Sequence, residues 1–170
     1  KDGNNVFTMD KNKQPQGLFS HAIAGLLKTT PDFLSFYAPH SNSYRRLVHN
    51  ADHAPTTLSW GNENRTALIR LPEASAEATR LEFRVASADS NPYLVFASIL
   101  ASVYSGIQGK LQHDQETIGN AHAQHPPSLG VTWREAVEKT SASSLVKDFF
   151  GEQFQQCYNC VKESEIKRFE

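Results

Sequence analysis

The segment 64–84, NRTALIRLPEASAEATRLEFR, limits the fold most, because it holds two short apolar stretches separated by a polar connection. Both stretches have the composition typical of strands, at 65–71 and 80–85, and a third strand is expected at 56–60. The connections between them are too short for helical crossovers. We therefore expect neighbouring strands to run antiparallel.

Charged and apolar residues alternate along the last of these strands. Leu81 and Phe83 point to one face of an extended strand, and Arg80, Glu82 and Arg84 point to the other. The apolar pair should therefore face the core. The charged row is open to two interpretations: a surface ladder of ion pairs, or one wall of a site for an anionic substrate.

Helical patterns lie on both sides of the strands. Apolar residues recur at helical spacing over 16–38, with a break expected at Pro31 and a second short helix after it. Asn91 is a capping residue and Pro92 a first-turn proline for a helix that should end at one of the two glycines that follow. The broad apolar stripe of this helix predicts that it lies deep against the sheet.

Further helices are expected near the C-terminal end, at 133–139 and 141–169, with Gly151 as a break. The segment 38–55 and the polar run that begins QHDQET are expected to be loops. The expected fold class is α+β, with antiparallel strands packed against several helices.

Size and charge narrow the class of protein. The chain has 170 residues, enough for one domain or part of one. Its 17 basic and 18 acidic residues nearly cancel, which argues against nucleic-acid or membrane-surface binding, since both need a basic face. No signal peptide or membrane-spanning run is visible, so a cytoplasmic location is the default. The chain starts without Met in a hairpin-like pattern and ends inside a helical one, so we expect a fragment.

Other chemically capable residues are weak candidates for a site. Cys157 and Cys160 form a single CxxC, which lacks the further ligands of a zinc site. His49 and His53 lie in a polar segment and are more often solvated residues than ligands. Trp60 has two equally good interpretations: it lines a substrate pocket, or it packs in the core.

Two more arginines, Arg65 and Arg70, bracket TALI on the neighbouring strand. Their odd separation puts them on opposite faces unless Arg65 lies in the preceding turn, which the residues GNEN favour. Pairing of the strands would then bring Arg70 to the charged row. This much positive charge calls for a polyanion such as phosphate, which guanidinium groups bind bidentately, while Glu82 could contribute one ligand to Mg²⁺.

Four motifs occur in an order and at gaps that resemble the C-terminal half of the catalytic domain of the glutamine synthetase family: NSYRRL at 42–47, NRTALIRLP at 64–72, RLEFR at 80–84 and NPYL at 91–94. The SWG at 59–61 and the NSYRR variant are more similar to the γ-glutamylpolyamine (putrescine) ligase branch than to the ammonia-using synthetases. The resemblance implies that residues 1–170 are a partial catalytic domain without its N-terminal part.

The resemblance implies an ATP-dependent ligase that joins the side-chain carboxylate of glutamate to a polyamine or to ammonia through a γ-glutamyl phosphate. ATP and Mg²⁺ (or Mn²⁺) are the implied cofactors, and a ring-forming homo-oligomer is the implied assembly of the parent protein. The motifs also carry implied roles: glutamate binding for Arg46 and Arg84, ATP binding for Arg65, Arg70 and Arg80, transition-state stabilisation for Arg65, and metal binding for Glu82.

Departures from the family pattern limit what the resemblance implies. The loop after NSYRRL has one residue more than the flap of the ammonia-using enzymes, and only Asp52 or His53 stands near the place of the flap's glutamate. Glu77 lies in the segment where that branch has a lysine, so one ATP contact is absent or supplied differently. The family's other magnesium ligands precede this chain, so we expect the fragment alone to be inactive. The alternative is a catalytically inactive relative with a structural or interaction role.

Overall fold

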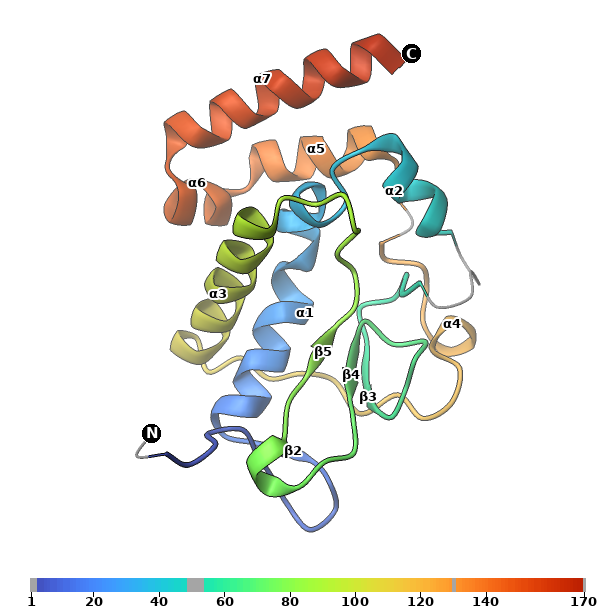
Figure 1. Ribbon diagram of the computed structural model, residues 1–170, viewed down its shortest axis with the longest axis vertical. Helices are drawn as coiled ribbons and strands as arrows, with labels where there is room; N and C mark the ends of the chain where they lie inside the picture. The colour runs from blue at the N-terminus through green and yellow to red at the C-terminus, as the bar shows by residue number, and fades with distance from the viewer. Residues whose placement is uncertain (1–2, 49–53, 130, 170) are drawn as a thin grey trace.

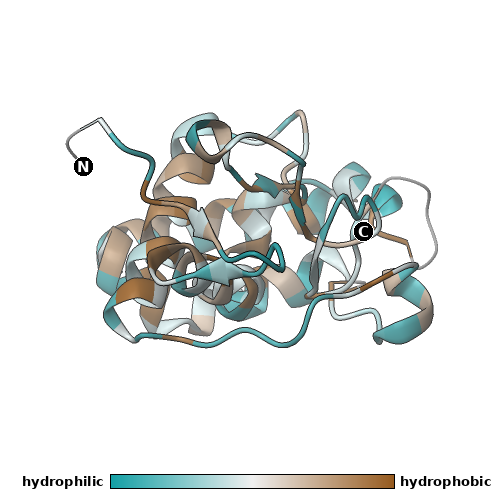
Figure 2. Ribbon diagram, turned by 90° about the horizontal axis from the view of Figure 1, so that it is seen from below, coloured by the Kyte–Doolittle hydropathy of each residue, from teal (hydrophilic) through white to brown (hydrophobic). Residues whose placement is uncertain are grey.

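The computed structural model describes residues 3–48, 54–129 and 131–169 (Figure 1). Helix α1 (Leu18–Tyr37) lies at the centre, and α3 (Pro92–Gln108) packs along it. The C-terminal helices lie across one end of α1, and a small sheet lies beside it. The helical part carries most of the hydrophobic residues, whereas the connecting segments are largely hydrophilic (Figure 2). The expected α+β class is confirmed.

Helix α1 is continuous, so the expected break at Pro31 is wrong. A proline inside a helix removes one amide donor and crowds the preceding turn, at a cost of about 3 kcal/mol. Burial of the apolar side chains that follow, Phe33, Leu34 and Phe36, offsets this cost, because each contributes about 1.5–3 kcal/mol. The residues expected to form a second short helix are therefore the last turns of α1.

The main sheet has three short strands in the order β3 (Trp60–Asn62), β4 (Ile69–Leu71) and β5 (Glu82–Phe83). Strands β4 and β5 are antiparallel, as expected, and Arg70 pairs with Glu82. Strands β3 and β4 are parallel, so the antiparallel expectation is wrong for this pair. The chain therefore reverses direction twice between these strands. The Asn64 side chain holds this connection in place through hydrogen bonds to Thr117 and Gly119.

The remaining short elements lie in the connections. A two-stranded hairpin pairs β1 (Thr8–Met9) with β2 (Pro15–Gln16), and a 3-10 turn, η1 (Ala76–Ala78), lies between β4 and β5. The two segments expected to be loops each hold a short helix, α2 (Ser41–Arg46) and α4 (Ala121–Gln124). Each is too short to give a periodic apolar pattern, and the expectation of irregular loops is wrong there.

Three helices form the C-terminal part: α5 (Trp133–Ala142), α6 (Ser144–Phe150) and α7 (Glu152–Phe169). The break at Gly151 is confirmed, and its φ of 85° is in the left-handed region that glycine adopts without strain. None of the helices in the described ranges is long and apolar enough to cross a membrane.

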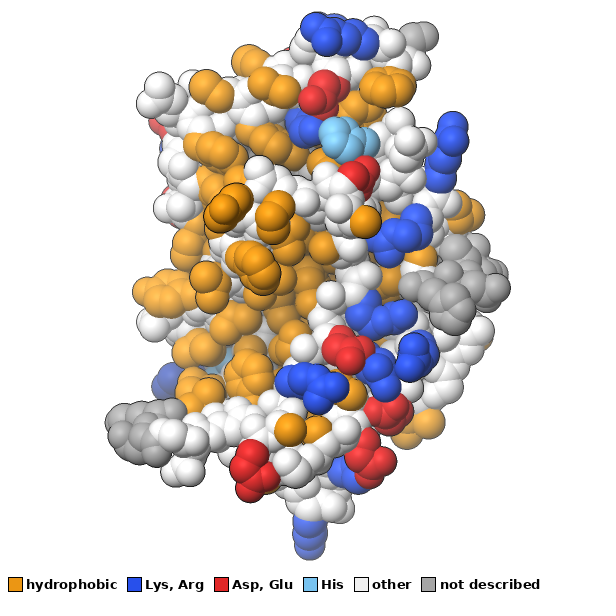
Figure 3. All heavy atoms as spheres, viewed as in Figure 1, with side chains coloured by type: hydrophobic (Ala, Val, Ile, Leu, Met, Phe, Trp, Pro, Cys, Tyr) orange, Lys and Arg blue, Asp and Glu red, His pale blue; other side chains and the backbone are white. Residues whose placement is uncertain are grey.

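Helix α3 begins as its sequence predicts, because the Asn91 side chain accepts a hydrogen bond from the amide of Tyr93. The expectation that this helix lies deep against the sheet is wrong. It packs on α1, and its outer face is exposed, with 83% of Tyr93 and 69% of Leu100 accessible to solvent. The apolar patch of Figure 3 includes this face.

The two long helices cross very closely at Gly25 of α1 and Gly106 of α3. A Cβ added to Gly25 would lie 2.2 Å from the carbonyl oxygen of Ser102 and 2.8 Å from the Cα of Gly106. Both contacts are with backbone atoms, so no side-chain rotation relieves them. The absence of side chains at these two positions therefore sets the spacing of α1 and α3.

We expect Gly25→Ala to lower the free energy of unfolding by about 2–3 kcal/mol, because α1 and α3 must move apart. Urea denaturation of the chain measures the change. Gly109→Ala is the matched control, since its added Cβ meets mainly a flexible leucine side chain and a carbonyl at 3.1 Å. Equal stability of the two variants would contradict the close helix crossing.

Candidate functional site

The charged residues singled out in the sequence gather on one side of the molecule, over β4 and β5 (Figure 3). Arg70 and Glu82 lie on these strands, and Arg84 follows β5 directly. Arg65 lies in the turn between β3 and β4, as expected from its spacing. The two strands thus bring these four residues together.

Arg70 forms ion pairs with two glutamates. Its Nη1 donates to Oε2 of Glu82 at 2.9 Å, and its Nη2 donates to Oε2 of Glu63 at 2.7 Å. These contacts raise the pKa of Arg70 above its usual value, and the hydrogen bond from Arg70 is the main reason that the pKa of Glu63 lies below its usual range. Only 14% of the Arg70 side chain is exposed, and its Nε is buried with no hydrogen-bond partner.

Glu82 lies between Arg70 of the neighbouring strand and Arg80 of its own segment, whereas alternation along the strand predicted Arg80 and Arg84 as its neighbours. Its second oxygen, Oε1, is 4.0 Å from Nη2 of Arg80, which is itself largely exposed. Glu82 therefore already has a counter-ion in Arg70. Within the described ranges, no group of three or more histidine, cysteine or acidic residues is placed to hold a metal ion.

Arg84 lies at the middle of the positive charge. Its Nη1 donates to the carbonyl oxygens of Arg65 and, at 3.1 Å, of Ala67. Burial lowers the pKa of Arg84, and the nearby guanidinium groups of Arg65 and Arg70 lower it further, while Glu82 opposes them. Arg84 thus ties the end of β5 to the turn that carries Arg65.

Arg46, at the end of α2, holds the segment between β5 and α3. Its Nη2 donates to the carbonyl oxygen of Val85 and, at 3.4 Å, to Oγ of Ser87. Burial lowers the pKa of Arg46, and the charge of Asp89 opposes this shift. Arg46 lies next to the arginine group, since its charge also acts on Arg84.

The turn between β3 and β4 is fixed by Asn64. Its Nδ2 donates to the carbonyl oxygens of Thr117 and Gly119, both at 2.8 Å, and its Oδ1 accepts from the amide and hydroxyl of Thr66. The side chain is almost fully buried. Asn64 thereby places its neighbour Arg65, whose side chain stays exposed.

Three residues of the site were missed by sequence reasoning: Glu63, Asn64 and Asp89. Glu63 and Asn64 belong to the quoted GNEN turn, and an acidic residue seven positions before an arginine gives no periodic signal of contact. Asp89 lies in the connection before α3, and its contact with Ser43 Oγ at 3.5 Å joins distant parts of the chain.

The other candidates have clear positions. Trp60 is 1% exposed, and its indole N–H donates to the carbonyl oxygen of Asp114 at 2.8 Å, so it packs in the core. Leu81 and Phe83 pack against the core, as expected. Cys157 and Cys160 are unpaired and exposed. His49, Asp52 and His53 lie outside the described residues.

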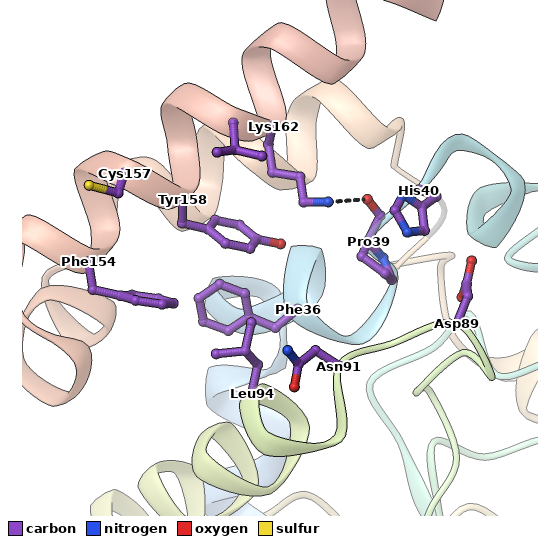
Figure 4. Close-up of a pocket in the computed structure, with 11 residues that line it drawn as sticks. Phe36, Pro39, His40, Asp89, Asn91, Leu94, Phe154, Cys157, Tyr158 and Lys162 are labelled. Atoms are coloured by element: carbon purple, nitrogen blue, oxygen red, sulfur yellow. Dashed lines mark hydrogen bonds between the residues drawn. The ribbon is translucent and has the colours of Figure 1, made fainter.

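An apolar pocket of about 350 Å³ lies between α7 and the end of α1, and Asp89 is one of the residues that line it (Figure 4). The buried ammonium of Lys162 donates to the carbonyl oxygen of Pro39 at 3.1 Å and to Glu165 at 2.7 Å. The Tyr158 hydroxyl donates to the carbonyl oxygen of Ser35. These bonds fasten α7 to the chain just before α2 and so help to place Arg46.

A family model described as the catalytic domain of glutamine synthetase matches residues 1–170. The chain is 33% identical over 168 residues to gamma-glutamylputrescine synthetase PuuA of Escherichia coli, and 35% identical over 175 residues to type-1 glutamine synthetase 2 of Dictyostelium discoideum. It is 32% identical over 169 residues to gamma-glutamylethanolamide synthetase GlnA4 of Streptomyces coelicolor. Each match covers 99% of this chain but only 35%, 33% and 36% of the respective relative. The chain thus spans about a third of the length of these relatives.

We expect Asn64→Asp to destabilise the chain by about 2 kcal/mol, because a carboxylate cannot donate to the carbonyl oxygens of Thr117 and Gly119 and is repelled by them. Urea unfolding at neutral pH measures the loss. Asn120→Asp is the matched control, since the Asn120 side-chain oxygen accepts from the amide of His122 at the start of α4, a role that Asp fills equally well. Equal stabilities would contradict the role given to Asn64.

Proposed function

The chain belongs to the glutamine synthetase catalytic domain family, and on that premise we propose that its parent protein is an ATP-dependent ligase that forms a γ-glutamyl amide from glutamate and an amine. The chain is then the C-terminal segment of the catalytic domain. The observation that carries the proposal is the group of guanidinium side chains around Arg84 on one side of β4 and β5.

In this reaction, most of the negative charge that the protein must stabilise lies on phosphoryl oxygens. The γ-carboxylate of glutamate attacks the γ-phosphorus of ATP, ADP leaves, and an acyl phosphate forms. The amine nitrogen then attacks the acyl carbon, inorganic phosphate leaves, and the nitrogen loses a proton. Charge on the transferring group is best stabilised by fixed cations in a site that excludes water.

The arginines suit different parts of this task. Arg65 is exposed on a turn that Asn64 holds rigidly, which suits contact with the transferring phosphoryl group. Arg70 and Arg80 lie on either side of Glu82 and would bind ATP phosphates. A hollow of about 470 Å³ is lined by residues of β1 and η1 and by Thr79, the neighbour of Arg80 in the sequence.

Arg84 and Arg46 would bind the carboxylates of glutamate. Their side chains are partly buried, and burial strengthens the interaction of a guanidinium with a carboxylate. Arg46 donates from Nη2 to Val85 and Ser87, and a guanidinium has five donors in all. Arg46 therefore has donors left for a substrate carboxylate.

The metal requirement of such a ligase is not met within the described residues. Glu82 offers one carboxylate, and Arg70 already pairs with it. A Mg²⁺ or Mn²⁺ ion, which would neutralise the ATP phosphates, needs further oxygen ligands. We propose that Glu82 is one ligand and that the others come from parts of the parent protein that precede this chain.

The preferred amine is proposed to be a polyamine or another primary amine rather than ammonia. The support is the SWG and NSYRR variants and the changed segment after residue 47. The relatives named above include enzymes named for putrescine and ethanolamide products as well as glutamine synthetases, at similar identity. A cytoplasmic ring-forming homo-oligomer is the proposed state of the parent.

The experiment that tests the function is amine-dependent phosphate release by the parent protein with glutamate, ATP and Mg²⁺. We expect release with putrescine or a similar amine to exceed release with ammonia. Faster release with ammonia would overturn the amine preference but not the ligase. No release with any amine would favour a catalytically inactive relative, for which the ion pairs of Arg70 with two glutamates are the supporting observation.

In the parent protein, Arg65→Ala should lower kcat about 100-fold or more with a small change in the KM for glutamate, because the lost charge acts on the transition state. Arg45→Ala is the matched control, since Arg45 is an exposed arginine beside Arg46. A change of less than threefold in kcat for Arg65→Ala would contradict the role of Arg65.

The chain of 170 residues by itself should release no phosphate above background, because Glu82 alone cannot hold the metal ions. A sensitive phosphate assay with each amine measures this. Turnover by the isolated chain at a rate near that of the parent would show that the metal ligands have been assigned wrongly.

A further inference from the structure

The Arg70 guanidinium has one edge that is only half used. Its Nε and Nη2 share the edge with which arginine binds an anion side-on. Nη2 donates to Oε2 of Glu63 at 2.7 Å, while Nε is buried and has no partner. The other end, Nη1, is held by Glu82 at 2.9 Å. Glu63 therefore occupies the anion-binding edge without saturating it.

The backbone aims the Glu63 carboxylate at this position. Glu63 has a φ of 50°, in the left-handed region that a residue other than glycine adopts only when other contacts hold it. Its amide donates to the carbonyl oxygen of Leu71 at 2.9 Å, and its Oε1 accepts from the amide of Glu73. Half of the Glu63 side chain is exposed, so its carboxylate can turn into solvent when an anion takes its place on Arg70.

We propose that Glu63 is an internal competitor for the anion-binding edge of Arg70 and thereby selects polyphosphate over carboxylate ligands. The proposal rests on the proposed function, in which Arg70 binds phosphate. A phosphate group that binds through Nε and Nη2 displaces Glu63 and satisfies the unpartnered Nε. Glu82 stays on Nη1 and keeps the guanidinium in place.

Competition explains the selectivity. An intramolecular carboxylate acts at a high effective concentration, so a free carboxylate of the same charge does not displace it. A triphosphate carries several negative charges and more acceptor oxygens, and it overcomes the same competitor. The site needs this discrimination, because glutamate and ATP both present anions to arginines that lie close together. Glu63 keeps the carboxylates of glutamate off Arg70 and leaves them to Arg46 and Arg84.

The test is titration calorimetry of the parent protein with inorganic triphosphate and, separately, with glutarate as a dicarboxylate probe, at pH 7.5 without metal. Glu63→Gln preserves shape and an acceptor for the Glu73 amide but removes the charge. We expect it to bind triphosphate about fivefold tighter than the unchanged protein. We also expect it to bind glutarate more tightly than the unchanged protein, in which Arg46 and Arg84, but not Arg70, are open to a carboxylate.

Two further variants control the measurement. Glu73→Gln removes an equal charge nearby, but its carboxylate pairs with Lys13 and not with Arg70, so we expect no gain in affinity beyond twofold. Glu63→Gln combined with Arg70→Gln should lose both the fivefold gain for triphosphate and the gain for glutarate, because both gains act through Arg70. Circular dichroism of each variant confirms that it is folded.

The outcomes separate this inference from the proposed function. If the parent protein binds triphosphate but Glu63→Gln leaves the affinity unchanged or weaker, the competition by Glu63 is overturned and phosphate binding by the site stands. If the gain persists without Arg70, or Glu73→Gln gives the same gain, the inference is also overturned, since the effect is then one of net charge. If no variant binds triphosphate, both the inference and phosphate binding by Arg70 are overturned.

Discussion

The contact between the Arg70 guanidinium and two carboxylates joins the three segments of the small sheet through their side chains, in addition to the backbone pairing of the strands. Glu63 comes from the turn after β3, Arg70 from β4 and Glu82 from β5. Strands of two or three residues make few hydrogen bonds with each other, so the register in which they pair depends largely on side-chain contacts between them. The positions of Arg65 and Arg84 depend on this register, because both residues lie at the ends of the same segments.

The site tolerates an excess of positive charge because backbone carbonyl oxygens accept hydrogen bonds from its guanidinium groups. Arg84 donates to the carbonyl oxygens of Arg65 and Ala67, and Arg46 donates to that of Val85. Burial lowers the pKa of Arg84, and repulsion by the neighbouring guanidinium groups lowers it further. Hydrogen bonds to carbonyl oxygens hold the side chains in place without cancelling their charge. The site is therefore preorganised for an anion and is only partly neutralised by its own glutamates.

The helices supply the rigid support. The close crossing at Gly25 and Gly106 fixes α3 against α1. Because the segment that leaves β5 leads directly into α3, this crossing limits where the end of β5 can lie. On the other side, the bonds from α7 to Ser35 and Pro39 fix the start of α2, which carries Arg46. Both ends of the arginine group are thus tied to the helical core.

Much of the site could be predicted from the sequence, because it depends on local rules. Alternation along a strand placed Glu82 and Arg84 opposite the core, and the spacing of Arg65 from Arg70 placed Arg65 in a turn. The capped start of α3 and the break at Gly151 also follow from local residues.

What could not be predicted depends on contacts between distant segments or on unusual backbone. The parallel pairing of β3 with β4 requires Asn64 to bond to carbonyl oxygens more than 50 residues away. The pairing of Glu63 with Arg70 requires a left-handed residue that is not glycine. Continuation of α1 through Pro31 reflects tertiary burial, which outweighs a local helix breaker. The exposed outer face of α3 cannot be read from its apolar stripe, because the stripe reports only that the face is apolar.

The most direct test of the central claim, that the arginines around Arg84 form a phosphate-binding wall, is a crystal structure of the parent protein with a non-hydrolysable ATP analogue. We expect phosphate oxygens within about 3.2 Å of the guanidinium nitrogens of Arg65 and Arg70, with Glu63 displaced from Nη2 of Arg70. Phosphates bound elsewhere, with Arg70 still paired to both glutamates, would contradict it.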